Sequence, residues 1–281
     1  MSFSFYTKAP HAPSLANLAA LADDRRFCCE DGPDGEPETK RLPDGYACHA
    51  YLHGASARGV EIVYERGELQ TRILSCSSDA DHALAIALAT GLAAKHGTLI
   101  TPEDRELGYG PDALRAEFGD AWIAQQLAFG ASVVATMVDR DGSTLEMSGC
   151  RRTFHVGPRF LASLRARRGA LRDRVLDAFV RLQYIDDDDA YYAANVMTVT
   201  PKRGAAYTIT AWAPGVSYLF PGTERLAVLA DDAAIEIPYA AGATLLGKRW
   251  TWLDERHGLV DAVDGAAWTA FVARAREHQL A

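Results

Sequence analysis

The sequence has little of what marks the specialised protein classes. It holds five cysteines in 281 residues, two of them adjacent (Cys28 and Cys29) and none in a CxxC pair, which argues against a disulfide framework. The first residues, Met1–Tyr6, lack a basic stretch followed by an apolar run, so we expect no secretory signal. These absences predict a cytoplasmic protein in a reducing compartment.

Catalytic and cofactor motifs are also missing. The segment Gly108–Gly110 departs from the GxGxxG pattern, and the chain has no GxSxG turn and no GxxxxGK[ST] loop. His49 and His53 beside Cys48 are residue types that bind zinc, but in a strand the two histidines would lie about 13 Å apart. We therefore expect no cofactor and no metal site, and a protein that is more simply explained without enzymatic activity.

The composition is that of an ordinary globular chain, with 48% hydrophobic and 23% charged residues. Because single cores stop growing at about 250 to 300 residues, this length predicts two lobes. We place an N-terminal α+β lobe at residues 1–141 and a C-terminal α+β lobe at residues 142–281. The boundary falls where a long helix ends and the charge changes sign.

Local patterns predict an α+β fold with mostly antiparallel sheets built from hairpins and with helices packed on them. The strand-like runs VEIVYE and ELQTRIL meet at Arg66 and Gly67, where a tight hairpin turn fits. A helix should follow, because Ser78 can cap its start, Asp81 completes a capping box and Gly97 ends it.

The later part of the chain alternates helical and extended patterns. The uncharged stretch 121–138 carries several polar residues, so it predicts a buried helix rather than a membrane span. Further helices are expected over about 159–167, 170–185 and 264–278. Between the last two, short strands from Asn195 onward predict a small meander.

Two tryptophans precede a pair of acids near the C-terminal end. Trp250 and Trp252 with Asp254 and Glu255 suggest a sugar platform beside two carboxylates, as glycosidases need. Adjacent acids rarely face one cleft together. We therefore interpret the tryptophans as core residues and the acids as a solvated pair.

Charge is segregated along the chain. The net charge is −8, yet residues 140–182 hold ten arginines against four acidic residues, a local charge of +6 that leaves −14 elsewhere. Arginine favours planar, bidentate contacts with carboxylates and phosphates. The simplest interpretation is that both signs cover a solvated and partly paired surface.

The acidic run Asp186, Asp187, Asp188 and Asp189 is the predicted partner-binding site, because such a patch attracts a basic protein. In the absence of catalytic motifs, we expect a non-enzymatic, cytoplasmic protein-binding protein of the bacterial immunity type, which neutralises a toxin by covering its site. Membrane and nucleic-acid binding are not expected, given the overall acidity and the lack of aromatics interleaved with the arginines.

Two alternatives stay open. One is an enzyme acting on an anionic or phosphorylated substrate, with a histidine such as His155 as base. Its anion-binding residues would be Arg151, Arg152, Arg159, Arg165, Arg168 and Arg172. The other is a structural or adaptor protein of a larger assembly, which would expose extensive apolar patches.

Overall fold

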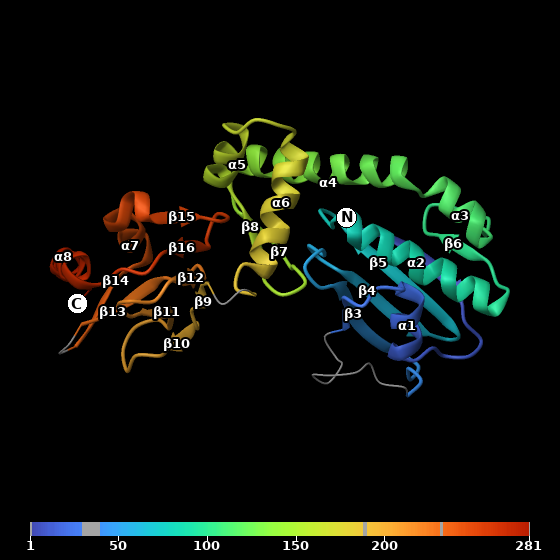
Figure 1. Cartoon of the computed structure of the whole chain (residues 1–281), viewed down its shortest axis with the longest axis horizontal. Helices are drawn as coiled ribbons and strands as arrows, with labels where there is room; N and C mark the ends of the chain where they lie inside the picture. The colour runs from blue at the N-terminus through green and yellow to red at the C-terminus, as the bar shows by residue number, and fades with distance from the viewer. Residues whose placement is uncertain (1, 30–39, 188–189, 231–232, 281) are drawn as a thin grey trace. The chain divides into compact units, whose positions relative to one another are not determined.

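The computed structural model of the chain describes residues 2–29, 40–187, 190–230 and 233–280. Within these ranges the chain forms eight α-helices and sixteen strands in mostly antiparallel sheets, which confirms the predicted α+β class (Figure 1). Its internal contacts divide it into two compact units. Unit 1 comprises 1–141, 146–154 and 164–183; unit 2 comprises 142–145, 155–163 and 184–281.

Unit 1 is built on a six-stranded antiparallel sheet in the order β2-β3-β4-β5-β1-β6. Its strands are β1 (Ser2–Lys8), β2 (Phe27–Cys29), β3 (Tyr46–Leu52), β4 (Val60–Glu65), β5 (Glu68–Leu74) and β6 (Ile100–Pro102). The predicted β4–β5 hairpin is confirmed. Its turn residues Arg66 and Gly67 both have positive φ, 52° and 76°, which places the glycine where a side chain would be strained.

The helices of unit 1 are α1 (Leu15–Ala22), α2 (Asp79–His96), α3 (Pro111–Glu117), α4 (Asp120–Asp141) and α6 (Leu171–Tyr184). Helix α2 crosses the sheet and contacts β1, β3, β4 and β5, and it also contacts α1, α3 and α4 (Figure 1). Leu84, Leu88 and Leu92 of α2 are buried against Phe5 and Ile62 of the sheet in one apolar core. The buried face of α2 therefore forms a central part of this core.

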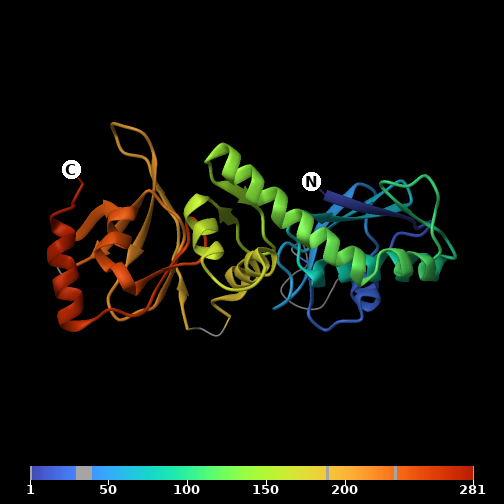
Figure 2. The ribbon, with the colours of Figure 1, turned by 90° about the horizontal axis from the view of Figure 1, so that it is seen from above.

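Helix α4 differs from its prediction. It is one long continuous helix (Figure 2). Within this helix, only 28% of an apolar stretch of 18 residues is buried. The expectation of a buried helix is therefore wrong. One side packs through Gly130, Val134 and Val138, whereas Phe129 and Met137 are exposed. By length and composition alone α4 is apolar enough to cross a membrane.

Between α4 and α6 the chain forms short elements. Strands β7 (Leu145–Met147) and β8 (Phe154–Val156) form a two-stranded sheet, and α5 (Pro158–Arg165) follows. In unit 1, the segment before β8 is held to α6 by the buried Gln183. Its amide oxygen accepts the backbone N–H groups of Arg151 (2.8 Å) and Arg152 (2.7 Å).

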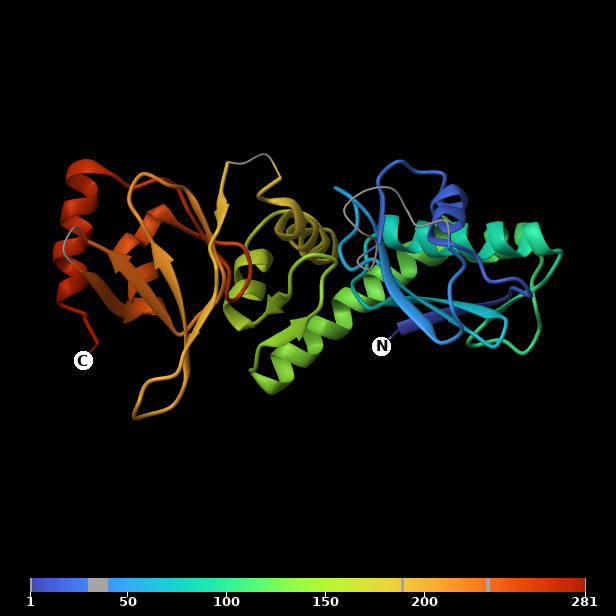
Figure 3. The same cartoon turned by 90° about the horizontal axis from the view of Figure 1, so that it is seen from below.

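Unit 2 contains two four-stranded sheets, β10-β11-β13-β14 and β15-β16-β12-β9. Its strands are β9 (Tyr192–Ala193), β10 (Met197–Val199), β11 (Tyr207–Trp212), β12 (Tyr218–Phe220), β13 (Arg225–Leu229), β14 (Ala234–Pro238), β15 (Trp250–Trp252) and β16 (Gly258–Val260). Helices α7 (Tyr239–Leu246) and α8 (Gly265–Arg276) contact β14, and the short 3-10 helix η1 (Gly247–Arg249) follows α7 (Figure 3). Trp212, Phe220, Trp250 and Phe271 fill the core.

The predicted strands after Asn195 exist, but they do not form a meander. Strand β11 pairs in parallel with β13, while β12, which lies between them in the sequence, belongs to the other sheet. Parallel neighbours need a connection longer than a hairpin turn, and here β12 is part of that connection. Local patterning therefore located the strands without revealing their partners.

Candidate functional sites

An open groove lies among three helices of unit 1, α2, α4 and α6 (labelled in Figure 1), with a volume of about 600 Å³. The lining residues are Ser78, Asp79, Ala80 and Ala83 at the start of α2; Asp120, Ile123, Ala124 and Leu127 of α4; and Arg172, Asp173, Leu176, Asp177 and Val180 of α6. Alanine side chains leave room at the bottom of this groove, its floor. Ala83 and Ala124 are both exposed in it.

The groove combines an apolar floor with an acidic rim. Its charged lining residues are four aspartates and one arginine, a net charge of −3, and the arginine, Arg172, pairs with Asp173 at 2.6 Å. Asp79, Asp120 and Asp177 are exposed on three different helices. Such a surface attracts a ligand with an apolar stripe and positive charges beside it.

The start of α2 is fixed by a buried carboxylate. Asp81 is fully buried, and its two oxygens accept backbone N–H groups from Ala57, Arg58, Gly59 and Ser78 at 2.8 to 3.2 Å. The capping box predicted from Ser78 and Asp81 is confirmed. Asp81 also ties the loop before β4 to the helix, which holds that side of the groove in place.

Next to Asp81, the ring of His82 packs edge-on against Trp122 of α4, with ring centroids 5.7 Å apart. Its Nδ1 lies 2.8 Å from the carbonyl oxygen of Ser78. Burial lowers the pKa of His82, although the hydrogen bond to Ser78 and the charges of Asp81 and Asp79 oppose this shift. His82 thus packs α2 against α4.

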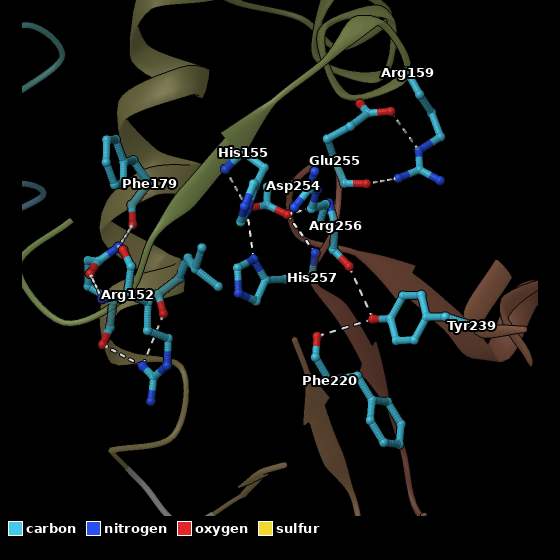
Figure 4. A network of polar contacts seen from close by, with 12 residues as sticks. Arg152, His155, Arg159, Phe179, Phe220, Tyr239, Asp254, Glu255, Arg256 and His257 are labelled. Atoms are coloured by element: carbon cyan, nitrogen blue, oxygen red, sulfur yellow. Dashed lines mark hydrogen bonds and ion pairs between the residues drawn. The ribbon is translucent and has the colours of Figure 1, made fainter. Parts of the chain in front are cut away.

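A second cluster lies in unit 2, where Figure 4 shows His155 and His257 turned toward Asp254. Asp254 is fully buried, and both histidines are 7% exposed. The Nδ1 atoms of His257 and His155 lie 2.9 and 3.4 Å from Asp254 Oδ2. The interpretation of Asp254 as a solvated acid is therefore wrong, because the turn after β15 directs this carboxylate inward.

Backbone groups fix the carboxylate of Asp254. Oδ2 accepts the N–H of His155 at 2.8 Å, and Oδ1 accepts the N–H groups of Arg256 (2.7 Å) and His257 (2.6 Å). Burial alone would raise the pKa of Asp254, but hydrogen bonds from His155 and His257 outweigh it and hold the pKa well below its usual range. The cluster therefore contains an ionised carboxylate facing two imidazoles.

The surroundings of this cluster are polar and aromatic. Arg159 lies over the ring of Trp252, 3.6 Å from its centroid, and donates to the carbonyl of Glu255. Glu255 in turn accepts the N–H of Phe160 at 2.8 Å. The hydroxyl of Tyr239 contacts the carbonyl of Arg256 at 3.1 Å, and burial raises the pKa of this phenol (Figure 4).

The predicted acidic patch is only partly described. Asp186 is half-buried and Asp187 is exposed just after α6, whereas Asp188 and Asp189 lie outside the described residues. The acidic rim of the groove is a separate feature. Sequence patterns predicted α2, α4 and α6 individually, but not that they would share one groove.

The predicted arginines have different neighbours rather than one common centre. Arg152 donates to the carbonyls of Leu182 (3.2 Å) and Gln183 (2.8 Å), and Arg165 forms a two-point contact with Asp139. The six arginines lie in four different places. Arg151 and Arg152 precede β8, and Arg159 and Arg165 are on α5. Arg168 is exposed between α5 and α6, and Arg172 lines the groove. Their described contacts are structural ones.

These features define an α+β protein with an acidic groove in one unit and a buried His–Asp–His cluster in the other. The chain belongs to the family described as a domain of unknown function (DUF4299), whose model matches residues 2–222. No curated protein and no solved structure matches the chain. The matched range includes every residue that lines the groove, whereas Asp254 and His257 lie beyond it.

Proposed function

We propose that this protein is a stoichiometric protein-binding protein that holds a basic, amphipathic helical segment of its partner in the groove between α2, α4 and α6. The observation that carries the proposal is the apolar floor beneath a rim of four aspartates and one arginine. Helices that bind in grooves place an apolar face on the floor and their polar residues at the edge. A partner with lysines or arginines at that edge matches the charge of this rim.

A toxin-neutralising protein of the bacterial immunity type is the kind of binding protein that we favour. Such a protein needs an accessible recognition surface and no catalytic group at it. None of the five cysteines forms a disulfide in the part of the chain that the structure describes, which is consistent with action in the cytoplasm. The basic effector would supply the helix, and the acidic rim would speed its association.

The enzymatic alternative has less support. An anion clamp needs guanidinium groups that converge, and here Arg152, Arg159 and Arg165 are engaged with backbone carbonyls or carboxylates of different elements. The adaptor alternative is supported by exposed apolar side chains, among them Phe129 and Met137 on α4. Neither offers a recessed site with complementary charge as the groove does.

The test uses a fluorescent helical peptide of leucine and lysine, with a leucine and glutamate peptide of the same pattern as its opposite in charge. We expect the full chain to bind the basic peptide in a 1:1 ratio, measured by anisotropy, and not the acidic one. The double variant Asp120→Asn/Asp177→Asn should weaken binding about fivefold, since exposed charge pairs each contribute little. Ala83→Trp should weaken binding of the basic peptide by about tenfold or more, because the indole fills the apolar floor of the groove.

Matched controls separate the groove from general acidity. Glu103→Gln/Glu106→Gln removes two exposed charges from a loop outside the groove, and Ala94→Trp adds an indole to an exposed position farther along α2. Both should bind like the wild type. Equal weakening by these controls or binding of the acidic peptide would refute the proposal. So would a dimer of the chain in sedimentation that Ala83→Trp abolishes, because a second copy would then occupy the groove.

A further inference from the structure

The His155, Asp254 and His257 cluster brings together three side chains of unit 2 whose residue types are common metal ligands. One potential ligand atom from each residue lies within 4.8 Å of the others. All three residues are buried, so solvent does not compete freely for them. Two imidazoles and a carboxylate are a ligand set that zinc uses.

The distances suit a metal ion of this size. Zinc bonds of about 2.0–2.1 Å in tetrahedral geometry place neighbouring ligand atoms about 3.3 Å apart. Asp254 Oδ2 lies 3.4 Å from His155 Nδ1 and 2.9 Å from His257 Nδ1. Side-chain shifts of less than an ångström therefore suffice to open the cluster around an ion.

Asp254 is held in place independently of its contact with His257. Its backbone bonds from His155, Arg256 and His257 fix both oxygens and do not involve the imidazoles. Hydrogen bonds of this kind orient a carboxylate ligand and limit its motion. A role in shaping the turn accounts for these backbone bonds, but it does not require two buried imidazoles on the same carboxylate.

We propose that His155 Nδ1, Asp254 Oδ2 and His257 Nδ1 bind one zinc ion, with a fourth position left for water. Where His257 donates its Nδ1 proton to Asp254, that proton leaves through solvent and another is taken up at Nε2, so the neutral imidazole changes tautomer with no net proton release. The metal then replaces the imidazole hydrogen bond at Oδ2, while the three backbone bonds remain. The site does not depend on the proposed peptide groove.

The full chain is first treated with a chelator and then titrated with zinc by calorimetry. We expect a 1:1 complex and a rise in the melting temperature of the wild type. His155→Gln and His257→Gln should each lower the zinc affinity by about a hundredfold or more, since loss of an outer-shell partner alone costs about 10–100-fold. His278→Gln, which changes an exposed histidine on the C-terminal side of α8, should bind like the wild type.

A second variant keeps the test decisive if the glutamine variants fold poorly. In His257→Cys the sulfur lies about where the imidazole Cγ was, nearer the backbone than Nδ1, and the longer metal–sulfur bond of about 2.3 Å makes up part of that difference. Cobalt binding should therefore persist and show a thiolate-to-cobalt absorption band that the wild type lacks. Ligation through Nε2 would place the metal beyond the reach of this sulfur. Absence of zinc binding by the wild type, unchanged binding by both glutamine variants, or absence of that band would overturn the assignment.

Discussion

At the scale of single residues, the two units share one feature, a buried aspartate that fixes a loop. Each has a fully buried aspartate, Asp81 in unit 1 and Asp254 in unit 2, whose carboxylate accepts several backbone N–H groups. Buried N–H groups are costly to leave without partners, so one ionised side chain that serves several of them fixes a loop strongly. Asp81 lies beside residues that line the groove, and Asp254 is itself part of the His–Asp–His cluster.

We predict that Asp81→Ala lowers the free energy of unfolding by about 3 kcal/mol or more, because it leaves four backbone donors without their acceptor. Urea denaturation followed by circular dichroism measures this. The control is Asp79→Ala on the same helical turn, where the carboxylate is exposed. That variant should cost about 0.5 kcal/mol through the helix dipole. Equal losses in the two variants would contradict the role given to Asp81.

The burial of His82 leads to a second prediction, which concerns how the free energy of unfolding depends on pH. Burial lowers the pKa of His82 below the value of about 6.5 that a histidine has in an unfolded chain, so the unfolded chain takes up the proton first as the pH falls. The stability conferred by neutral His82 is complete above about pH 6.5 and is lost as the pH falls toward the folded pKa, with a slope of at most about 1.4 kcal/mol per pH unit.

Urea denaturation at several pH values between 7.5 and 5 tests this expectation. The wild type should lose more stability over the range than His82→Gln, which cannot bind the proton. His278→Gln, at an exposed position, serves as the matched change. An identical pH profile for the wild type and His82→Gln would show that another group controls the acid sensitivity.

At the scale of elements, the sequence predicted what depends on neighbours along the chain. The capping box at Ser78, the αL glycine at Gly97 and the Arg66–Gly67 turn are local, and the structure confirms all three. The helices expected over 170–185 and 264–278 are also present, as Leu171–Tyr184 and Gly265–Arg276. Each rests on contacts within a few residues.

Predictions that depended on distant partners fared worse. Periodicity located α4 but could not reveal which of its sides would be covered, because its uncharged residues continue around the helix. Strand patterns could not show that β11 pairs with β13 across β12. The His–Asp–His cluster joins residues 155 and 254 through a tertiary contact, and no spacing motif announces such a pair.

At the scale of the whole molecule, the charge segregation seen in the sequence takes a different form. The arginine-rich stretch is largely engaged locally, as in Arg165 with Asp139 and Arg152 with the end of α6, so it does not present one basic face through these residues. Acidic side chains from three separate segments meet at the groove instead. Charge along the chain therefore did not indicate where acidic side chains from separate segments would meet.

The two proposed ligands belong to different units, which leads to a last prediction. A ligand at about one hundred times its Kd stabilises the folded state by about 2.7 kcal/mol, enough to slow exchange through the affected opening about a hundredfold. In hydrogen exchange the basic peptide should protect α2, α4 and α6, and zinc should protect β8 and the turn around residues 253–258. Ala83→Trp should remove only the first pattern, and His257→Gln only the second. If either ligand instead protected the other ligand's segments, or if one variant removed both patterns, the two sites could not be the separate features that their residues indicate.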